Sequence, residues 1–144
     1  MKKYIYSLLL LLFLMSSCEI EHSNNGKLDG FWHLESIDTL STGGHTDLSK
    51  YRLFWSVQGD LMAFNDYSYK LLPCILQFQY AKDNLTLHHI LISDRSKGDI
   101  VIKDTKQIKY YGVNSLNESF KIESLNAFDM QLSTKKLRLS FKRF

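Results

Sequence analysis

Cysteine, proline and clustered basic residues are all scarce in this sequence. The chain of 144 residues contains two cysteines, Cys18 and Cys74, and a single proline. A small scaffold held together by several disulfides is therefore excluded. Lysine and arginine are scattered and form no basic block, so the electrostatic footprint of a nucleic-acid-binding protein is missing.

Motifs of catalysis and metal binding are also missing. There is no Gly-x-Ser-x-Gly nucleophile motif and no glycine-rich phosphate-binding loop. His88 and His89 are adjacent, and neighbouring residues of a strand point to opposite faces of a sheet, so they are not expected to share one metal ion. The sequence therefore predicts a protein that is not an enzyme and carries no metal or cofactor.

One long hydrophobic run is present, and it lies at the start of the chain. Lys2 and Lys3 precede an apolar stretch over residues 4–15, which is too short to cross a bilayer. A charged start, a short apolar stretch and small residues after it are typical of a secretory signal peptide. Met15-Ser16-Ser17-Cys18 resembles the bacterial lipobox, in which the cysteine is lipidated and the chain is cut just before it. The alternative is an ordinary signal peptide in which Cys18 stands by chance.

The lipobox resemblance predicts the location of the protein. Residues 1–17 would be a cleaved lipoprotein signal peptide, and the polar residues 18–27 a lipidated, flexible tether. Several acyl chains on Cys18 make a stable anchor, which predicts attachment to the outer membrane of a Gram-negative-type envelope, on its periplasmic side or at the cell surface. Cleavage removes two lysines and leaves a formal net charge of +1, so charge suggests no particular partner, and we expect a monomer.

The rest of the chain, residues 28–144, is a succession of short strands and turns. Apolar and polar residues alternate, and no helical period is sustained beyond two turns. Residues 41–45 and 93–99 are predicted to be polar loops. Residues 100–113 fit either one strand and a turn or a short helix near 103–109. The predicted strands cover residues 28–40, 51–57, 61–64, 75–81, 85–92, 120–123, 128–133 and 137–142.

This pattern predicts an all-β fold, an antiparallel up-and-down meander of about eight to nine strands. Such a set of strands closes as a barrel or packs as a sandwich. About eight strands enclose an interior that side chains fill or that holds one small ligand. An integral outer-membrane barrel, which the aromatic Phe144 would suit, is disfavoured by the lipobox and the short strands.

Gly30-Phe31-Trp32, at the start of the first predicted strand, resembles the Gly-x-Trp signature of lipocalins and related calycin barrels. Together with Leu34 and the closing segment 137–144, it makes residues 28–144 look like the small lipocalin-like lipoproteins of bacterial envelopes. Most members of that family have no assigned activity. The resemblance implies a lipocalin-like β-barrel whose closed end is plugged by Trp32.

The resemblance also implies a basic partner for that tryptophan. A basic residue of the last strand packs across the indole in lipocalins, and either Arg138 or Arg143 could take this role here. A guanidinium over an indole contributes about 0.5–2 kcal/mol. The Thr-Asp-Tyr motif and the C-terminal helix of typical lipocalins are missing from this sequence.

Two functions remain open, and they depend on whether the barrel is hollow. A hollow barrel would bind a small hydrophobic or amphipathic ligand in an apolar interior with a few polar groups. A filled barrel would instead be a non-catalytic protein-interaction module of the cell envelope. The candidate ligand-binding residues are Trp55, Phe64, Phe78, Tyr80 and His89.

Overall fold

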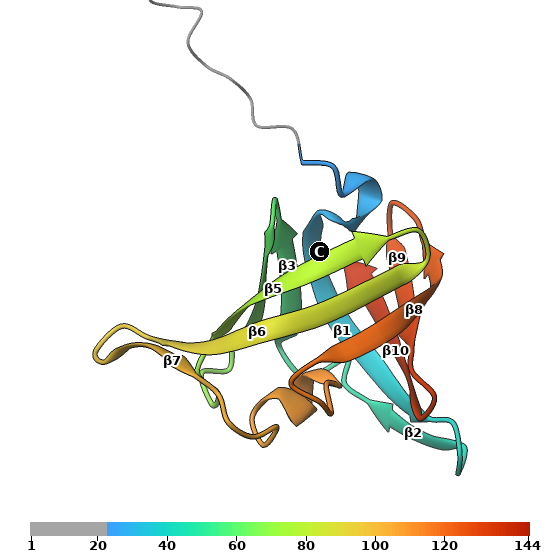
Figure 1. Cartoon of the computed structure of the whole chain (residues 1–144). Helices are drawn as coiled ribbons and strands as arrows, with labels where there is room; N and C mark the ends of the chain where they lie inside the picture. Colours follow the sequence, from blue (N-terminus) through green and yellow to red (C-terminus); the bar gives the residue numbers. More distant parts are fainter. Residues whose placement is uncertain (1–22) are drawn as a thin grey trace, which may run out of the picture.

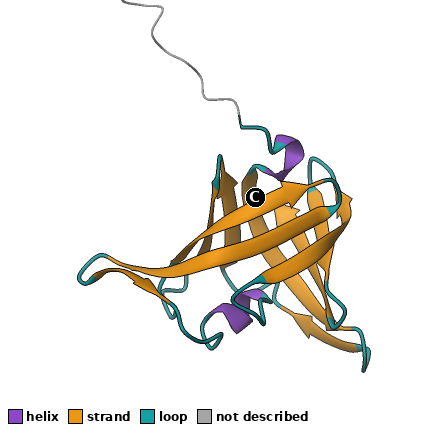
Figure 2. Cartoon of the chain, in the orientation of Figure 1, coloured by secondary structure: helices purple, strands orange, loops and turns teal. Residues whose placement is uncertain are grey.

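Ten antiparallel strands make up nearly all of the regular structure (Figures 1 and 2). The structure is a computed structural model and describes residues 23–144; the predicted signal peptide and Cys18 lie outside the described residues. The elements in chain order are η1 (Gly26–Leu28), β1 (Gly30–Thr39), β2 (Gly44–Asp47), β3 (Leu53–Gln58), β4 (Leu61–Asp66), β5 (Cys74–Ala81), β6 (Asn84–Asp94), β7 (Gly98–Val101), η2 (Ile108–Tyr111), β8 (Glu118–Leu125), β9 (Asp129–Ser133) and β10 (Leu137–Arg143).

Eight of these strands form a closed ring. The order around the ring is β1-β3-β4-β5-β6-β8-β9-β10, and β10 pairs back onto β1. The two remaining strands each pair with one strand of the ring. β2 pairs with the second half of β1, and β7 pairs with the end of β6. The all-β antiparallel barrel predicted from the sequence is therefore confirmed.

Three segments differ from the sequence prediction. Part of the predicted loop 41–45 belongs to β2, and the predicted loop 93–99 is mostly the end of β6 and the start of β7. Residues 100–113 contain both the end of β7 and η2. Every residue of β2 and β7 is exposed, so neither strand has a buried face to leave an apolar alternation in the sequence.

Three β-bulges decide which side chains face the interior. The ladders shift register at Glu35 in β1, near His89 in β6 and at Glu123 in β8. In β1 the extra residue lets Trp32 on one side of the bulge and Ile37 on the other both pack into the core. Bulges also bend strands and increase their twist, which a closed barrel of this size requires.

Trp32 closes one end of the barrel. Its indole is fully buried and donates a hydrogen bond to the carbonyl of Leu28 (2.8 Å). The guanidinium of Arg143 lies over the indole, 4.4 Å from the ring centroid. Its Nη1 and Nη2 donate hydrogen bonds to the carbonyls of Asp29 (2.8 Å) and Lys27 (2.6 Å). Arg143 thus ties the last strand to the segment that enters the first.

Arg138, the other candidate for this role, is too far away to take it. It pairs with Asp38, six residues along β1 from Trp32, which is about 20 Å of extended strand. Alternation favours Arg143, because it shares a face with the buried Leu139 and Phe141, whereas Arg138 falls on the opposite face. The register of β10 on β1 then places Arg143 opposite Trp32.

Gly30 makes room for this arginine. Its φ angle of +145° is one that residues with side chains rarely adopt, and a Cβ at this position would overlap Nη1 of Arg143 and lie 3.0 Å from its Cζ. The glycine of the Gly-x-Trp signature is therefore a consequence of the arginine that covers the tryptophan.

The substitution Gly30→Ala tests this close approach. We expect it to lower the free energy of unfolding by about 2–4 kcal/mol, because it combines backbone strain with displacement of the Arg143 guanidinium. The matched control is Gly59→Ala, where φ is also positive (+57°) but no atom lies within 4 Å of the added Cβ. It should cost only about 1–2 kcal/mol. Equal losses for both variants in urea denaturation would contradict the role given to Gly30.

Candidate functional site

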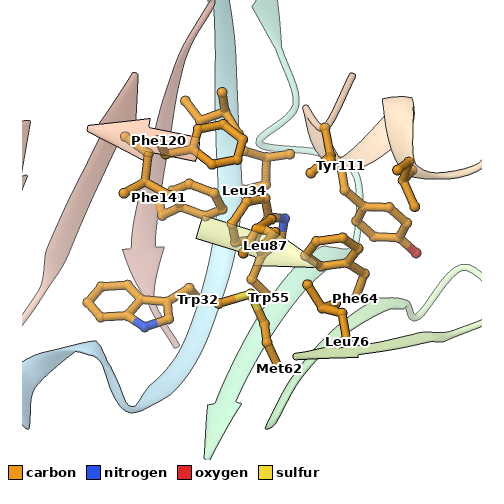
Figure 3. Packing of buried hydrophobic residues seen from close by; sticks show 14 of the residues in the cluster. Trp32, Leu34, Trp55, Met62, Phe64, Leu76, Leu87, Tyr111, Phe120 and Phe141 are labelled. Carbon is orange, nitrogen blue, oxygen red and sulfur yellow. The ribbon is translucent and has the colours of Figure 1, made fainter. Parts of the chain in front are cut away.

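The interior of the barrel is filled by its own side chains (Figure 3). Trp55 lies at the centre, with ring centroids at 4.7 Å from Phe64, 5.0 Å from Phe141 and 5.8 Å from Phe120. Phe64 also stacks on Tyr111 at 5.1 Å. Each of these five side chains is at most 2% exposed. The space in which a hollow barrel would hold a ligand is therefore occupied by packed aromatic rings.

Both ends of the barrel are closed as well. Trp32 covers one end, and η2 covers the other, where Figure 1 shows it across the barrel from η1. Ile108, Tyr111 and Val113 from this segment are fully buried. Gly112 ends η2 with φ +82°, and a Cβ there would lie 2.5 Å from Leu139 Cδ2, so the helix packs directly against the wall.

The five residues expected to line a ligand cavity do not come together. Trp55 and Phe64 belong to the packed core, and Phe78 is half-buried against it. Tyr80 and His89 are exposed on the surface. The expectation of a shared interior cavity lined by these side chains is therefore wrong.

The bulge in β6 explains why His89 lies outside. Strict alternation from the buried Leu87 would turn His89 inward, but the next buried residue is Ile90. His89 adopts a positive φ of +52° as the extra residue of the bulge. His88 and His89 therefore both lie on the outer side of β6, where opposite faces were predicted. Residues 23–144 contain no group of three histidine, cysteine or acidic side chains placed to hold a metal ion.

Buried titratable groups in the core are held in their neutral forms. Burial raises the pKa of the Cys74 thiol to about 11, although Gln107 Nε2 donates a hydrogen bond to its sulfur at 3.3 Å. Burial also raises the pKa of the Tyr111 phenol well above its usual range. A nucleophilic cysteine needs a lowered pKa, so this thiol has the properties of a structural residue.

A groove lies on the outer wall of the barrel, beside β1 and β3. It has a volume of about 390 Å³. Phe31 and Phe54 form its floor, and they point outward because their neighbours Trp32 and Trp55 point inward. We call it the outer aromatic groove; its lining residues are Phe31, His33, Ser49, Lys50, Tyr51, Arg52, Phe54, Tyr67 and Phe144.

Four aromatic rings in this groove contact one another. Phe31 and Phe54 are stacked with centroids 4.5 Å apart. Tyr67 meets Phe54 edge to face at 5.5 Å, and Phe144 does so at 5.4 Å. Phe54 is only 5% exposed although it faces outward, whereas Phe144 is 85% exposed. The cluster is thus a second apolar centre, outside the barrel and open on one side.

The rim of the groove is basic and comes from residues 48–52, which connect β2 to β3. The guanidinium of Arg52 lies 5.8 Å from the centroid of the Tyr67 ring. His33 holds the connection in place, because its Nε2 lies 2.6 Å from the carbonyl oxygen of Tyr51 and its Nδ1 lies 2.6 Å from Glu35 Oε1. Arg52 is therefore carried by a connection that is attached to the wall.

Sequence reasoning missed this groove. A signal was present in the alternation of the two strands. Phe31 precedes Trp32 and Phe54 precedes Trp55, so each phenylalanine lies on the face opposite to its tryptophan. Large aromatic residues on both faces of two neighbouring strands indicate that the outer face is also partly covered. The sequence does not indicate that Tyr67 and Phe144 also line the groove, because these residues contact Phe31 and Phe54 only in the folded chain.

The closed ring, the plugged end with Trp32 and the covering Arg143 define a lipocalin-like barrel. A sequence profile of the lipocalin-like domain family matches residues 13–144. The chain belongs to this family, whose members are generally non-catalytic.

Solved structures share the fold. A lipocalin-like protein from Bacteroides uniformis superposes with a TM-score of 0.63 at 16% identity, over 83% of this chain and 100% of that chain. An uncharacterized protein from Bacteroides eggerthii gives a TM-score of 0.58 at 13% identity, over 81% and 98% of the two chains. No curated protein matches the sequence. Within residues 23–144, no helix has the length and apolar character needed to cross a membrane.

The substitution Phe64→Ala tests the filled interior. It removes a fully buried ring that contacts Trp55 and Tyr111, so we expect the free energy of unfolding to fall by about 3–5 kcal/mol in chemical denaturation. Tyr69→Ala is the control, since Tyr69 is 86% exposed and its loss should change stability by no more than about 0.5 kcal/mol. A loss below about 1 kcal/mol for Phe64→Ala would mean that the interior is loosely packed.

Proposed function

We propose that this protein is a non-catalytic, lipid-anchored protein of the cell envelope that binds a small amphipathic molecule on the outer wall of its barrel. The observation that carries the proposal is the contrast between the two faces of β1 and β3. Their inner faces are packed solid, whereas their outer faces form an aromatic groove that is open to solvent.

The size and lining of the outer aromatic groove suit a small molecule. Ligand pockets in proteins typically occupy about 300–1,000 Å³ and combine an apolar lining with a few polar groups. The groove has about 390 Å³, five aromatic residues in its lining and a rim with His33, Lys50 and Arg52. A molecule with an apolar body and a polar group would contact both parts.

The proposed anchor rests on the lipobox at residues 15–18. If Cys18 carries the lipid, residues 18–25 separate it from η1, and eight extended residues span at most about 28 Å. The barrel would then stay close to the membrane surface, where amphipathic molecules concentrate. The groove lies near the end of the barrel where η1 leads into β1. Phe144 lines the groove and donates its backbone N–H to the carbonyl of Phe31 (2.9 Å), and Phe31 is the second residue of β1.

A second candidate function, protein interaction, is favoured by the arm formed by β6 and β7. This arm projects from the barrel in Figure 1, and Ile100 and Val101 on β7 are 45% and 57% exposed. The outer edge of a terminal strand presents free backbone N–H and C=O groups that a strand of another protein can pair with.

Binding in the groove can be measured with the neutral fluorophore N-phenyl-1-naphthylamine. The chain starting at residue 18 with Cys18→Ala carries no lipid and should bind the dye with a rise in fluorescence. Tyr67→Ala should weaken binding roughly three- to tenfold, because it removes one aromatic wall. Tyr110→Ala removes an exposed tyrosine elsewhere and should have no effect. Absence of binding, or equal effects of both variants, would overturn the groove as the binding site.

The anchor is tested by feeding cells a clickable palmitate analogue. The wild-type protein should take up the label and sediment with membranes, whereas Cys18→Ala should lose the label. Cys74→Ala is the matched control, since it removes the other cysteine and should be labelled like the wild type. Labelling that persists in Cys18→Ala would show that the lipobox prediction is wrong.

A further inference from the structure

We propose that the outer aromatic groove selects amphipathic anions: a flat apolar body lies against Phe31 and Tyr67, and its negative group is bound by Arg52 and Lys50. The inference rests on the proposed function and adds the charge of the ligand to it. It follows from which charges line the groove, from how Arg52 is held and from the size of the space.

The charged side chains of the lining all have the same sign. Among the nine lining residues, Lys50 and Arg52 carry a positive charge near neutral pH. The nine include no aspartate or glutamate. The nearby carboxylate of Glu35 lies 2.6 Å from His33 Nδ1 and is already engaged there. Asp47 has its pKa lowered, mainly by hydrogen bonds from Ser49 and to a smaller extent by Lys50. Within residues 23–144, no carboxylate side chain lies within ion-pairing distance of Lys50 or Arg52.

Arg52 is placed to bind an anion at the aromatic wall. The backbone N–H of Tyr67 donates to the carbonyl of Arg52 (2.9 Å), which joins the two residues across the β3–β4 pair. The guanidinium lies 5.8 Å from the Tyr67 ring, and in residues 23–144 its nitrogens donate no hydrogen bond to protein. A guanidinium presents five donors in a planar fork that matches the oxygens of a carboxylate, sulfonate or phosphate. An anionic group beside Tyr67 would therefore meet unused donors.

The space fits a body of one or two fused rings with a short headgroup. A volume of about 390 Å³ lies at the small end of ligand pockets, and stacked or edge-on rings already line it. A flat body adds another such contact, whereas a protein partner would need a larger surface, about 800 Å² on each side. The groove is thus better matched to a small planar anion than to a protein.

Two fluorophores that differ by one charge test the inference. N-phenyl-1-naphthylamine and 8-anilinonaphthalene-1-sulfonate share one ring system, and only the second carries a sulfonate. We expect the sulfonate dye to bind about tenfold more tightly at low salt, as one charge-assisted hydrogen-bonded contact allows. Raising the salt concentration from 20 mM to 500 mM should remove most of this advantage, because the rim is exposed.

Variants at Arg52 separate charge from shape. Arg52→Gln should weaken binding of the sulfonate dye about tenfold and leave the neutral dye within twofold. Arg52→Lys keeps the charge without the planar fork, and its affinity for the sulfonate dye should lie between those of the wild type and Arg52→Gln. Lys97→Gln removes a cation from the turn between β6 and β7, outside the groove, and should leave the affinity for both dyes unchanged. Circular dichroism and thermal unfolding of each variant establish that the fold is retained.

The outcomes distinguish failure of this inference from failure of the proposed function. Equal affinities for the two dyes, or a loss for both dyes in Arg52→Gln, would overturn selection by charge while groove binding stands. Absence of binding by either dye, or binding that Tyr67→Ala leaves unchanged, would overturn the groove as a site and this inference with it.

Discussion

The contact of Arg143 with Trp32 is the interaction on which the closed barrel depends. Every other neighbour in the ring is close along the chain, whereas β1 and β10 join its two ends, with hydrogen bonds from Arg143 to carbonyls 114 and 116 residues away. Closing so long a loop has a large entropic cost, which the ladder between the two strands and the stacked guanidinium offset. Gly30 has no side chain because the guanidinium occupies that space.

Closure and filling of the barrel determine where a ligand can bind. A ring of eight strands encloses a volume that side chains alone can fill, and here Trp55 and the rings around it do so. With Trp32 at one end and η2 at the other, the interior is a core in the ordinary sense. The family fold is therefore retained with its interior filled over the described residues, and the proposed function places the ligand on the outer wall.

The outer aromatic groove shows how one pair of strands serves two purposes. Trp32 and Trp55 face inward, while Phe31 and Phe54, the residues just before them, face outward. Outward aromatic residues are not needed to stabilise the core, and a contiguous apolar patch on a monomer commonly marks an interaction site. Its basic rim distinguishes this patch from a simple extension of the core.

Local patterns predicted much of this fold but little of the candidate site. Alternation of apolar and polar residues determined, from the sequence alone, an antiparallel meander. The resemblance of Gly30-Phe31-Trp32 to the lipocalin signature implied that Trp32 plugs its closed end. Alternation failed at His89, because a single extra residue in β6 reverses the face of every residue after it. Only the tertiary structure decided that Arg143 lies opposite Trp32, that the interior is filled and that a groove forms outside. Each of these depends on register and on the summed volume of side chains from strands that are distant in sequence, which no local pattern contains.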